Sequence, residues 1–191
     1  TQVPRYCRIN RVIRDIPSPN VVAGNRNTSL RQDVAKEMAR RGTHCQCIRC
    51  REVRAEAVEA TDLTLHDLVY SAGGAEEHFI SFDTPDDHLA GFLRLSLPNG
   101  NPLAIPDLES AAIIREVHVY GQSLEVGADQ SGAAQHRGLG RKLIAQAEAI
   151  AIARGYVNLA VISAVGTREY YAARGFVNGA LYMVKDLKAK K

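Results

Sequence analysis

The sequence lacks any apolar run that approaches the roughly 20 residues needed to cross a bilayer, although hydrophobic residues make up 46% of its 191 residues. This absence excludes a membrane-spanning helix and the apolar core of a secretory signal, so we expect a soluble, cytoplasmic protein. Internal repeats and low-complexity tracts are also absent. The chain begins with Thr1 instead of methionine, and residues 1–17 read as the middle of a longer protein. We therefore expect an upstream domain.

Acidic residues are scarce in the first part of the chain. Residues 1–54 contain 12 Lys and Arg against 4 Asp and Glu, a net charge of +8, whereas residues 55–191 contain 12 against 17, a net charge of −5. A basic arm is typical of proteins that bind a polyanion such as nucleic acid, because Lys and Arg neutralise phosphates and release counterions. The alternative is a solvated linker that packs against an acidic partner domain. We predict a basic linker segment at residues 1–54 and a globular domain at 55–191.

The hydrophobic pattern also differs between these two parts. In the first, alternating apolar and basic residues at 8–16 predict a strand, and Leu30–Arg41 forms a helical pattern with Thr28 or Ser29 as its cap. In the second, short alternating segments separated by turn residues predict an antiparallel meander. The predicted strands there are 52–59, 77–83, 89–97, 112–120 and 156–163, with short strands near Phe176 and at 181–184, and the predicted helices are 138–153 and 167–173. This order indicates a mixed α/β domain of the α+β class rather than a doubly wound parallel sheet.

Cysteine is rare, but three of the four cysteines lie within six residues, at Cys45, Cys47 and Cys50. In a reducing compartment such spacing favours a metal over a disulfide, and thiolates suit tetrahedral zinc. We predict Cys7 as the fourth ligand, with His44 as the second choice. Such a zinc would be structural and would fix the basic segment to the start of the globular domain. Reduced loop thiols and an iron–sulfur site are the alternatives.

A glycine-containing turn precedes the longest predicted helix. Gly138 and Gly140, in the run Gln135–Gly140, allow the backbone to approach an anion, and the N–H groups and dipole at the helix start favour a pyrophosphate. The cationic side chains beside this turn are Arg137, Arg141 and Lys142. Glycine also begins helices for steric reasons alone. A dinucleotide-binding fingerprint is absent, because it needs a third glycine and an acidic residue about 20 positions further on.

The run Gln-His-Arg-Gly-Leu-Gly at 135–140 resembles the Q/R-x-x-G-x-G/A signature of the GNAT acetyltransferases. The segments 113–121 and 156–176 extend this resemblance to the acetyltransferase domain of the Elongator catalytic subunits and their single-chain prokaryotic relatives. In addition, 11–17 and 49–53 resemble the junction between the radical-SAM and acetyltransferase domains of that family. The resemblance covers nearly the whole chain and implies that the radical-SAM domain is the upstream part.

The resemblance implies a GNAT acyl-CoA N-acyltransferase fold in which two central strands, 112–120 and 157–163, part to admit the pantetheine arm of acetyl-coenzyme A. The residues that would contact this cofactor are Val117, Val119, Gln135, His136, Arg137, Gly138, Leu139, Gly140, Arg141 and Tyr171. The polar loop at 121–134 is long enough to gate the site.

Strand alternation places Glu116, His118 and Tyr120 on one face of the strand, and Arg115, Val117 and Val119 on the other. Either Glu116 or His118 would be the general base, because burial tunes a carboxylate or an imidazole toward neutral pH. The alternative for each is a hydrogen-bonded polar residue of a strand.

The resemblance also places a tyrosine near the sulfur of the coenzyme, where a phenol can protonate the departing thiolate. Tyr170 and Tyr171 are the candidates. Adjacent helical residues point about 100° apart, so both cannot face the thioester equally. The alternative is an aromatic core residue.

For function, the resemblance implies an acetyl-coenzyme A dependent acyltransferase that is triggered by tRNA. Its acetyl unit would reach the wobble uridine through the radical-SAM domain, which alone would carry a 4Fe-4S cluster and S-adenosylmethionine. The alternatives are a protein lysine acetyltransferase, and a non-catalytic, zinc-stapled module that binds tRNA.

Overall fold

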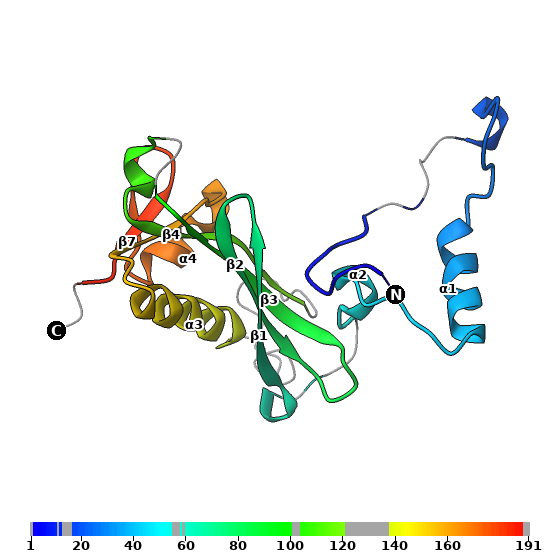
Figure 1. Cartoon of the computed structure of the whole chain (residues 1–191), viewed down its shortest axis with the longest axis horizontal. Coiled ribbons are helices and arrows are strands. Elements are labelled where there is room, and N and C mark those ends of the chain that lie inside the picture. The colour runs from blue at the N-terminus through cyan, green and yellow to red at the C-terminus, as the bar shows by residue number, and fades with distance from the viewer. Residues whose placement is uncertain are drawn as a thin grey trace. The chain divides into compact units, whose positions relative to one another are not determined.

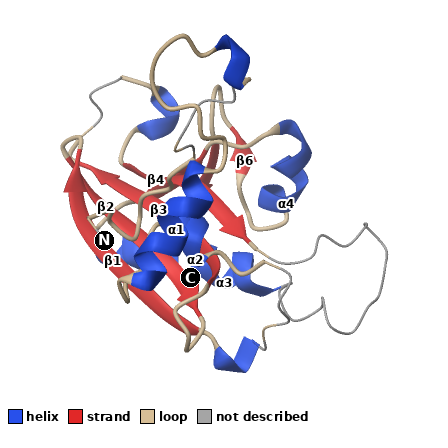
Figure 2. Ribbon diagram, turned by 90° about the vertical axis from the view of Figure 1, so that its right-hand side faces the viewer, coloured by secondary structure: helices blue, strands red, loops and turns tan. Residues whose placement is uncertain are grey.

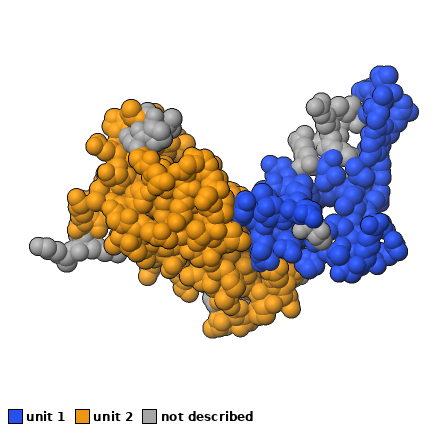
Figure 3. Space-filling model, in the orientation of Figure 1, with its two compact units in different colours: residues 1–52 blue, residues 53–191 orange. Residues whose placement is uncertain are grey.

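The structure is a computed structural model that describes residues 2–10, 12, 17–54, 58, 60–100, 104–120 and 138–188. It divides the chain into two compact units, Thr1–Glu52 and Val53–Lys191 (Figure 3). Our division into functional domains at residue 54 stays a prediction. The predicted gating loop at 121–134 lies outside the described residues.

The first unit contains the helices α1 (Leu30–Arg40) and α2 (Ile48–Arg51) and a short 3-10 turn, η1 (Ser18–Asn20). The predicted helix at Leu30–Arg41 is confirmed, but the cap differs. Ser29 occupies the cap position without a side-chain hydrogen bond. Instead, the Asn27 side chain accepts the Ser29 N–H at 2.8 Å and donates to Asp33 at 2.6 Å. The strand expected at 8–16 is absent from the part of that range that the structure describes.

The second unit is built on a seven-stranded sheet in the order β1-β2-β3-β4-β5-β7-β6. Its strands are β1 (Thr64–Ala72), β2 (Ala75–Asp83), β3 (Leu89–Pro98), β4 (Ala111–Val119), β5 (Asn158–Val161), β6 (Val177–Asn178) and β7 (Met183–Asp186). β1 to β4 form an antiparallel meander (Figure 2). β4 and β5 are parallel, and such a pair needs a crossover connection. Helix α3 (Leu139–Ala153) lies in that connection.

The remaining elements are helix α4 (Arg168–Ala172) and the 3-10 turns η2 (Ala60–Asp62), η3 (Pro106–Leu108) and η5 (Val165–Thr167). The sheet and helices confirm the mixed α/β class. Among the described helices, none has both the length and the apolar character that crossing a membrane requires.

The core lies between α3 and one face of the sheet (Figure 1). The helix contributes buried residues at helical spacing, namely Leu139, Leu143, Ile144, Ala147 and Ala151. Facing side chains come from β2 to β5 and include Ile80, Leu93, Leu95, Ile114 and Leu159. Because this apolar contact runs along the whole helix, it fixes the position of both helix ends relative to the sheet.

The predicted start of the sheet needs correction. The segment predicted as a strand at 52–59 contains no strand in its described residues, and the first strand of the sheet is β1, which we did not predict. β1 lies at the edge of the sheet, and most of its side chains are exposed. An edge strand that is exposed on both faces has no strong apolar alternation, so the periodic signal was missing.

A largely buried ion pair joins α3 to β7. The Lys185 ammonium group donates to Glu148, and the two side chains are only 17% and 10% exposed. Glu148 therefore occupies an otherwise apolar helix face with its charge compensated.

Replacing Lys185 by Met would leave the buried Glu148 carboxylate without this cation. We expect the free energy of unfolding to fall by about 3 kcal/mol, as for other buried pairs that lose one partner. Arg154→Met is the matched control, because the Arg154–Glu76 pair is exposed and such pairs contribute little. Denaturant titration of both variants checks this, and equal losses would contradict the assignment.

Candidate functional site

The ladder between the two parallel strands contains only four residue pairs, because β5 ends at Val161. β4 and β5 pair from Ala111 with Asn158 to Ile114 with Val161. Beyond Ile114, β4 continues to Val119 and stays paired only with β3. β5 stops short of the expected range 157–163, so the opening that we expected corresponds to the stretch of β4 beyond the end of β5. It gives residues 115–119 one edge that no described strand covers.

A bulge in β4 lies where the opening begins. Arg94 pairs with Glu116 and Leu95 pairs with Ile114, so Arg115 has no opposing residue in β3. Strict alternation predicted that Arg115 and Val117 share one face of the strand. Because of the bulge, they lie on opposite faces. Val117 packs against the core, whereas Arg115 reaches Glu77 on the opposite face at 3.3 Å.

The two candidate bases lie on the sheet face opposite α3 and have different surroundings. The Glu116 carboxylate accepts a hydrogen bond from Arg94 at 2.9 Å, and the Arg94 guanidinium lies 5.7 Å from the Phe92 ring centroid. His118 is exposed and contacts Phe92 and Tyr120, with ring centroids 6.0 and 4.5 Å away. The Glu116 side chain is thus held in an ion pair, while the imidazole faces solvent.

The amino end of α3 begins beside this opening. Gly138 is the cap residue, and no side chain of the described residues caps the helix. Gly138 is exposed, and a Cβ atom added to it would meet none of the described residues within 4 Å. Leu139 is buried in the core, so only its backbone can serve a ligand, and Arg141 is exposed. The predicted contacts Gln135, His136 and Arg137 lie outside the described residues.

The sequence context indicated that Gly140 lets an anion approach the backbone. In the structure, a neighbouring side chain explains why this residue is glycine. A Cβ atom there would stand 2.5 Å from the hydroxyl oxygen of Tyr170 and 3.8 Å from Val119. The Tyr170 hydroxyl therefore lies against the first turn of α3, close to the end of β4. Glycine at 140 makes room for a phenol, whereas Gly138 is exposed.

The structure separates the two adjacent tyrosines. Tyr171 is 8% exposed and packs in the core against Phe176, with ring centroids 5.6 Å apart. Burial, together with the neighbouring Tyr170 phenol, raises the pKa of Tyr171 against the opposing effect of Arg174. Tyr170 is 37% exposed, and its hydroxyl is the one at the opening. Catalytic roles for both, and a cofactor contact for Tyr171, stay predictions.

Exposed apolar side chains follow the parted strands. Val119 ends β4, Ile162 follows β5, and Val165 lies in η5, with exposed fractions of 36%, 62% and 77%. These side chains accompany the uncovered backbone edge of β4 and the start of α3. This combination fits an extended ligand that has an apolar arm and a diphosphate.

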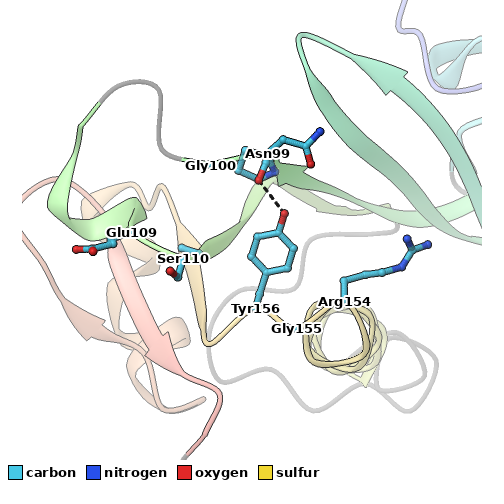
Figure 4. Close-up of a pocket in the computed structure, with 9 residues that line it drawn as sticks. Asn99, Gly100, Glu109, Ser110, Arg154, Gly155 and Tyr156 are labelled. Carbon is cyan, nitrogen blue, oxygen red and sulfur yellow. Dashed lines mark hydrogen bonds between the residues drawn. The ribbon is translucent and has the colours of Figure 1, made fainter.

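A separate pocket of about 450 Å³ lies at the carboxyl end of α3, beside Arg154 and Gly155 (Figure 4). The Tyr156 hydroxyl donates to the Pro98 carbonyl across it at 2.8 Å. None of the site residues predicted from the sequence lines this pocket.

In the first unit, the thiols of Cys45, Cys47 and Cys50 lie within 4.8 Å of one another. Burial opposes ionisation of the Cys47 thiol, but hydrogen bonds from the Ile9 and Cys50 backbone and from the two other thiols outweigh it and lower its pKa to about 7. Burial and the interaction with Cys47 raise the pKa of Cys50 to about 11. One sulfur thus accumulates negative charge, and three sulfurs at this spacing can ligate one metal ion.

Neither candidate for a fourth ligand belongs to this group. The Cys7 carbonyl accepts the N–H of Ile48 at 2.9 Å, which holds this backbone beside the start of α2. The Cys7 and His44 side chains do not join the three clustered thiols. Their roles as ligands stay predictions.

Comparisons with known proteins agree with this geometry. The family model described as acetyltransferase (GNAT) matches residues 48–176. The chain is 42% identical to the tRNA uridine(34) acetyltransferase of Dehalococcoides mccartyi, over 97% of this chain and 41% of the relative. It is 37% identical to Elongator complex protein 3 of Homo sapiens, over 97% of this chain and 35% of that relative. The chain therefore spans less than half the length of these relatives.

Among solved structures, the archaeal Methanocaldococcus infernus Elp3 is similar, with a TM-score of 0.83 and 32% identity over 97% of this chain and 45% of that chain. The likeness includes the first unit as well as the sheet.

The contact between Gly140 and Tyr170 can be tested by a double-mutant cycle. Gly140→Ala should destabilise the protein by about 1–3 kcal/mol, because the added carbon meets the phenol oxygen. In the Tyr170→Phe background the nearest ring carbon is 3.6 Å away, so most of the loss should disappear. Gly138→Ala, where Cβ has open space, is the control. Thermal unfolding measures all four variants, and additive effects of the two changes would refute the contact.

Proposed function

Since the chain belongs to the acetyltransferase (GNAT) family, we propose that it binds acetyl-coenzyme A and supplies the acetyl unit for modification of the wobble uridine of tRNA. The short pairing of β4 with β5 near the start of α3 carries this proposal. The similarity to a tRNA uridine(34) acetyltransferase and to Elongator complex protein 3 supports tRNA as trigger and substrate. A radical-SAM domain elsewhere in the full protein would be the partner, with its own 4Fe-4S cluster and S-adenosylmethionine.

The described residues would suit two parts of this cofactor, the diphosphate and the pantetheine arm. The backbone at Gly138 and the N–H groups of the first turn of α3 would hold the diphosphate, with Arg141 adding charge. The uncovered edge of β4, at Val117 and Val119, would pair with the amide groups of the pantetheine arm. Gln135, His136 and Arg137 complete the proposed diphosphate contacts.

Acetyl-coenzyme A supplies an acetyl group activated as a thioester. The exposed imidazole of His118 is the better placed of the two candidate bases, because Arg94 engages the Glu116 carboxylate. His118 would accept a proton from the attacking acceptor. The Tyr170 hydroxyl would donate a proton to the leaving sulfur, since a phenol stays protonated at neutral pH.

This assignment of roles predicts different effects of two substitutions. His118→Ala should lower kcat for thioester cleavage about 100-fold, the range expected when a general base is lost. Glu116→Gln should have a smaller effect. Tyr156→Phe, at the far end of α3, is the control and should change neither kcat nor KM. Release of free thiol, with and without tRNA, measures the reaction, and calorimetric titration measures acetyl-coenzyme A binding.

Other outcomes of the same experiment decide against the proposal. Absence of acetyl-coenzyme A binding under every condition would favour a non-catalytic module. Cleavage stimulated by lysine-containing peptides but not by tRNA would favour a lysine acetyltransferase.

We also propose that Cys45, Cys47 and Cys50 hold a structural zinc ion. The convergence of three thiols, one of them with a lowered pKa, supports this role. The basic surroundings would then serve the polyanionic partner, and the metal would hold that surface in one conformation.

The purified chain should contain about one zinc per molecule, and removing it by chelation should lower the thermal midpoint of the first unit. Cys45→Ser should abolish metal retention, as measured by atomic absorption. Cys7→Ser and His44→Ala identify the fourth ligand, since only the true ligand should weaken retention. A zinc-free chain with unchanged melting on chelation would exclude the site.

A further inference from the structure

Arg174 contacts Tyr170 in two ways. It lies four residues after Tyr170, and its Nη1 donates to the Tyr170 carbonyl oxygen. Its guanidinium carbon lies 3.4 Å from the centroid of the Tyr170 ring, a close cation–π contact. A single side chain therefore fixes both the backbone and the ring plane of this tyrosine.

This arrangement leaves one nitrogen of the Arg174 guanidinium without a hydrogen bond in the part of the chain that the structure describes. The Arg174 Nε atom is buried and has no hydrogen-bond partner among the described residues. A buried donor without an acceptor is unfavourable. The arginine thus retains its stacked position despite an unsatisfied polar group, which indicates that the stacked geometry itself is what matters.

The Tyr170 hydroxyl lies where the start of α3 meets the end of β4. It lies against Gly140, in the first turn of α3, and close to Val119, at the end of the parted strand β4. The first turn of α3 is the element proposed to hold the diphosphate, and the edge of β4 is the one proposed to pair with the pantetheine arm. Without the guanidinium on its ring, Tyr170, which is 37% exposed, could rotate toward solvent and withdraw the hydroxyl from this junction.

We infer that Arg174 is a positioning residue that holds the Tyr170 hydroxyl at the junction of α3 and β4. This inference rests on the proposed function for its chemical meaning, since the hydroxyl would protonate the leaving sulfur there. The placement itself is a structural statement that can be tested without activity.

The first test uses stability. Gly140→Ala forces the Tyr170 hydroxyl to move, and in the Arg174→Met background the ring is free to do so. The loss of thermal midpoint caused by Gly140→Ala should therefore be at most half as large in Arg174→Met as in the otherwise unchanged protein. Arg168→Met, an exposed arginine at the start of α4, is the matched control and should leave that loss unchanged. Strictly additive losses with Arg174→Met would overturn the inference.

The second test uses the reaction. Arg174→Met should lower kcat for thioester cleavage about 10-fold, with KM for acetyl-coenzyme A changed less than about 2-fold, because the hydroxyl acts on the leaving group rather than on binding. Arg174→Lys should recover only part of kcat, since an ammonium group lacks the planar stack. In the Tyr170→Phe background, Arg174→Met should have no further effect on kcat.

The two tests separate the inference from the proposed function. An unchanged kcat in Arg174→Met, in a protein that does cleave acetyl-coenzyme A, would overturn the inference alone. A protein that neither binds nor cleaves acetyl-coenzyme A would overturn the proposed function, and the stability cycle would still decide whether Arg174 places Tyr170.

Discussion

The limited pairing between β4 and β5 is the constraint on which the site depends. Four parallel residue pairs join the strands, and the bulge at Arg115 marks the point where β4 begins to run alone. A longer parallel ladder would satisfy the backbone groups of residues 115–119 with protein partners and leave nothing for a ligand to pair with. The end of β4 also lies near the first turn of α3, where a Cβ atom on Gly140 would stand 3.8 Å from Val119.

The core makes this opening stable. α3 is anchored along its length by apolar side chains and by the ion pair between Glu148 and Lys185. Because its buried face is fixed, its amino end cannot shift to close the opening. Tyr171 belongs to that same core, and its burial sets the orientation of α4. The neighbouring Tyr170 points in a different direction, so that its hydroxyl lies beside Gly140 in the first turn of α3.

The sequence predicted the elements that have strong periodicity, namely α1, α3 and the strands β2 to β5. It also predicted the cysteine cluster, and the family resemblance implied a gap between the two central strands, which pair over only four residues. It did not predict β1, whose exposed edge position removes the alternation, or the face of Arg115, because a bulge breaks the two-residue period. The choice between Tyr170 and Tyr171 and the reason for Gly140 depend on contacts between separate elements. Arg174 had a local signal that we did not use, since it lies four residues after Tyr170, just past the end of α4.

The sparse packing of the first unit gives a second reason to expect a metal, besides the spacing of its cysteines. Helix α1 has no buried residue, and among the described residues of this unit only Cys47, Ile48 and Arg51 are buried. A segment of this size with so little apolar burial cannot offset the entropy of ordering its chain. Its net positive charge adds repulsion. Three converging thiols supply the missing free energy if they bind a metal, because ligand binding then becomes folding free energy. The proposed zinc would thus be what keeps a basic, weakly packed surface in one conformation.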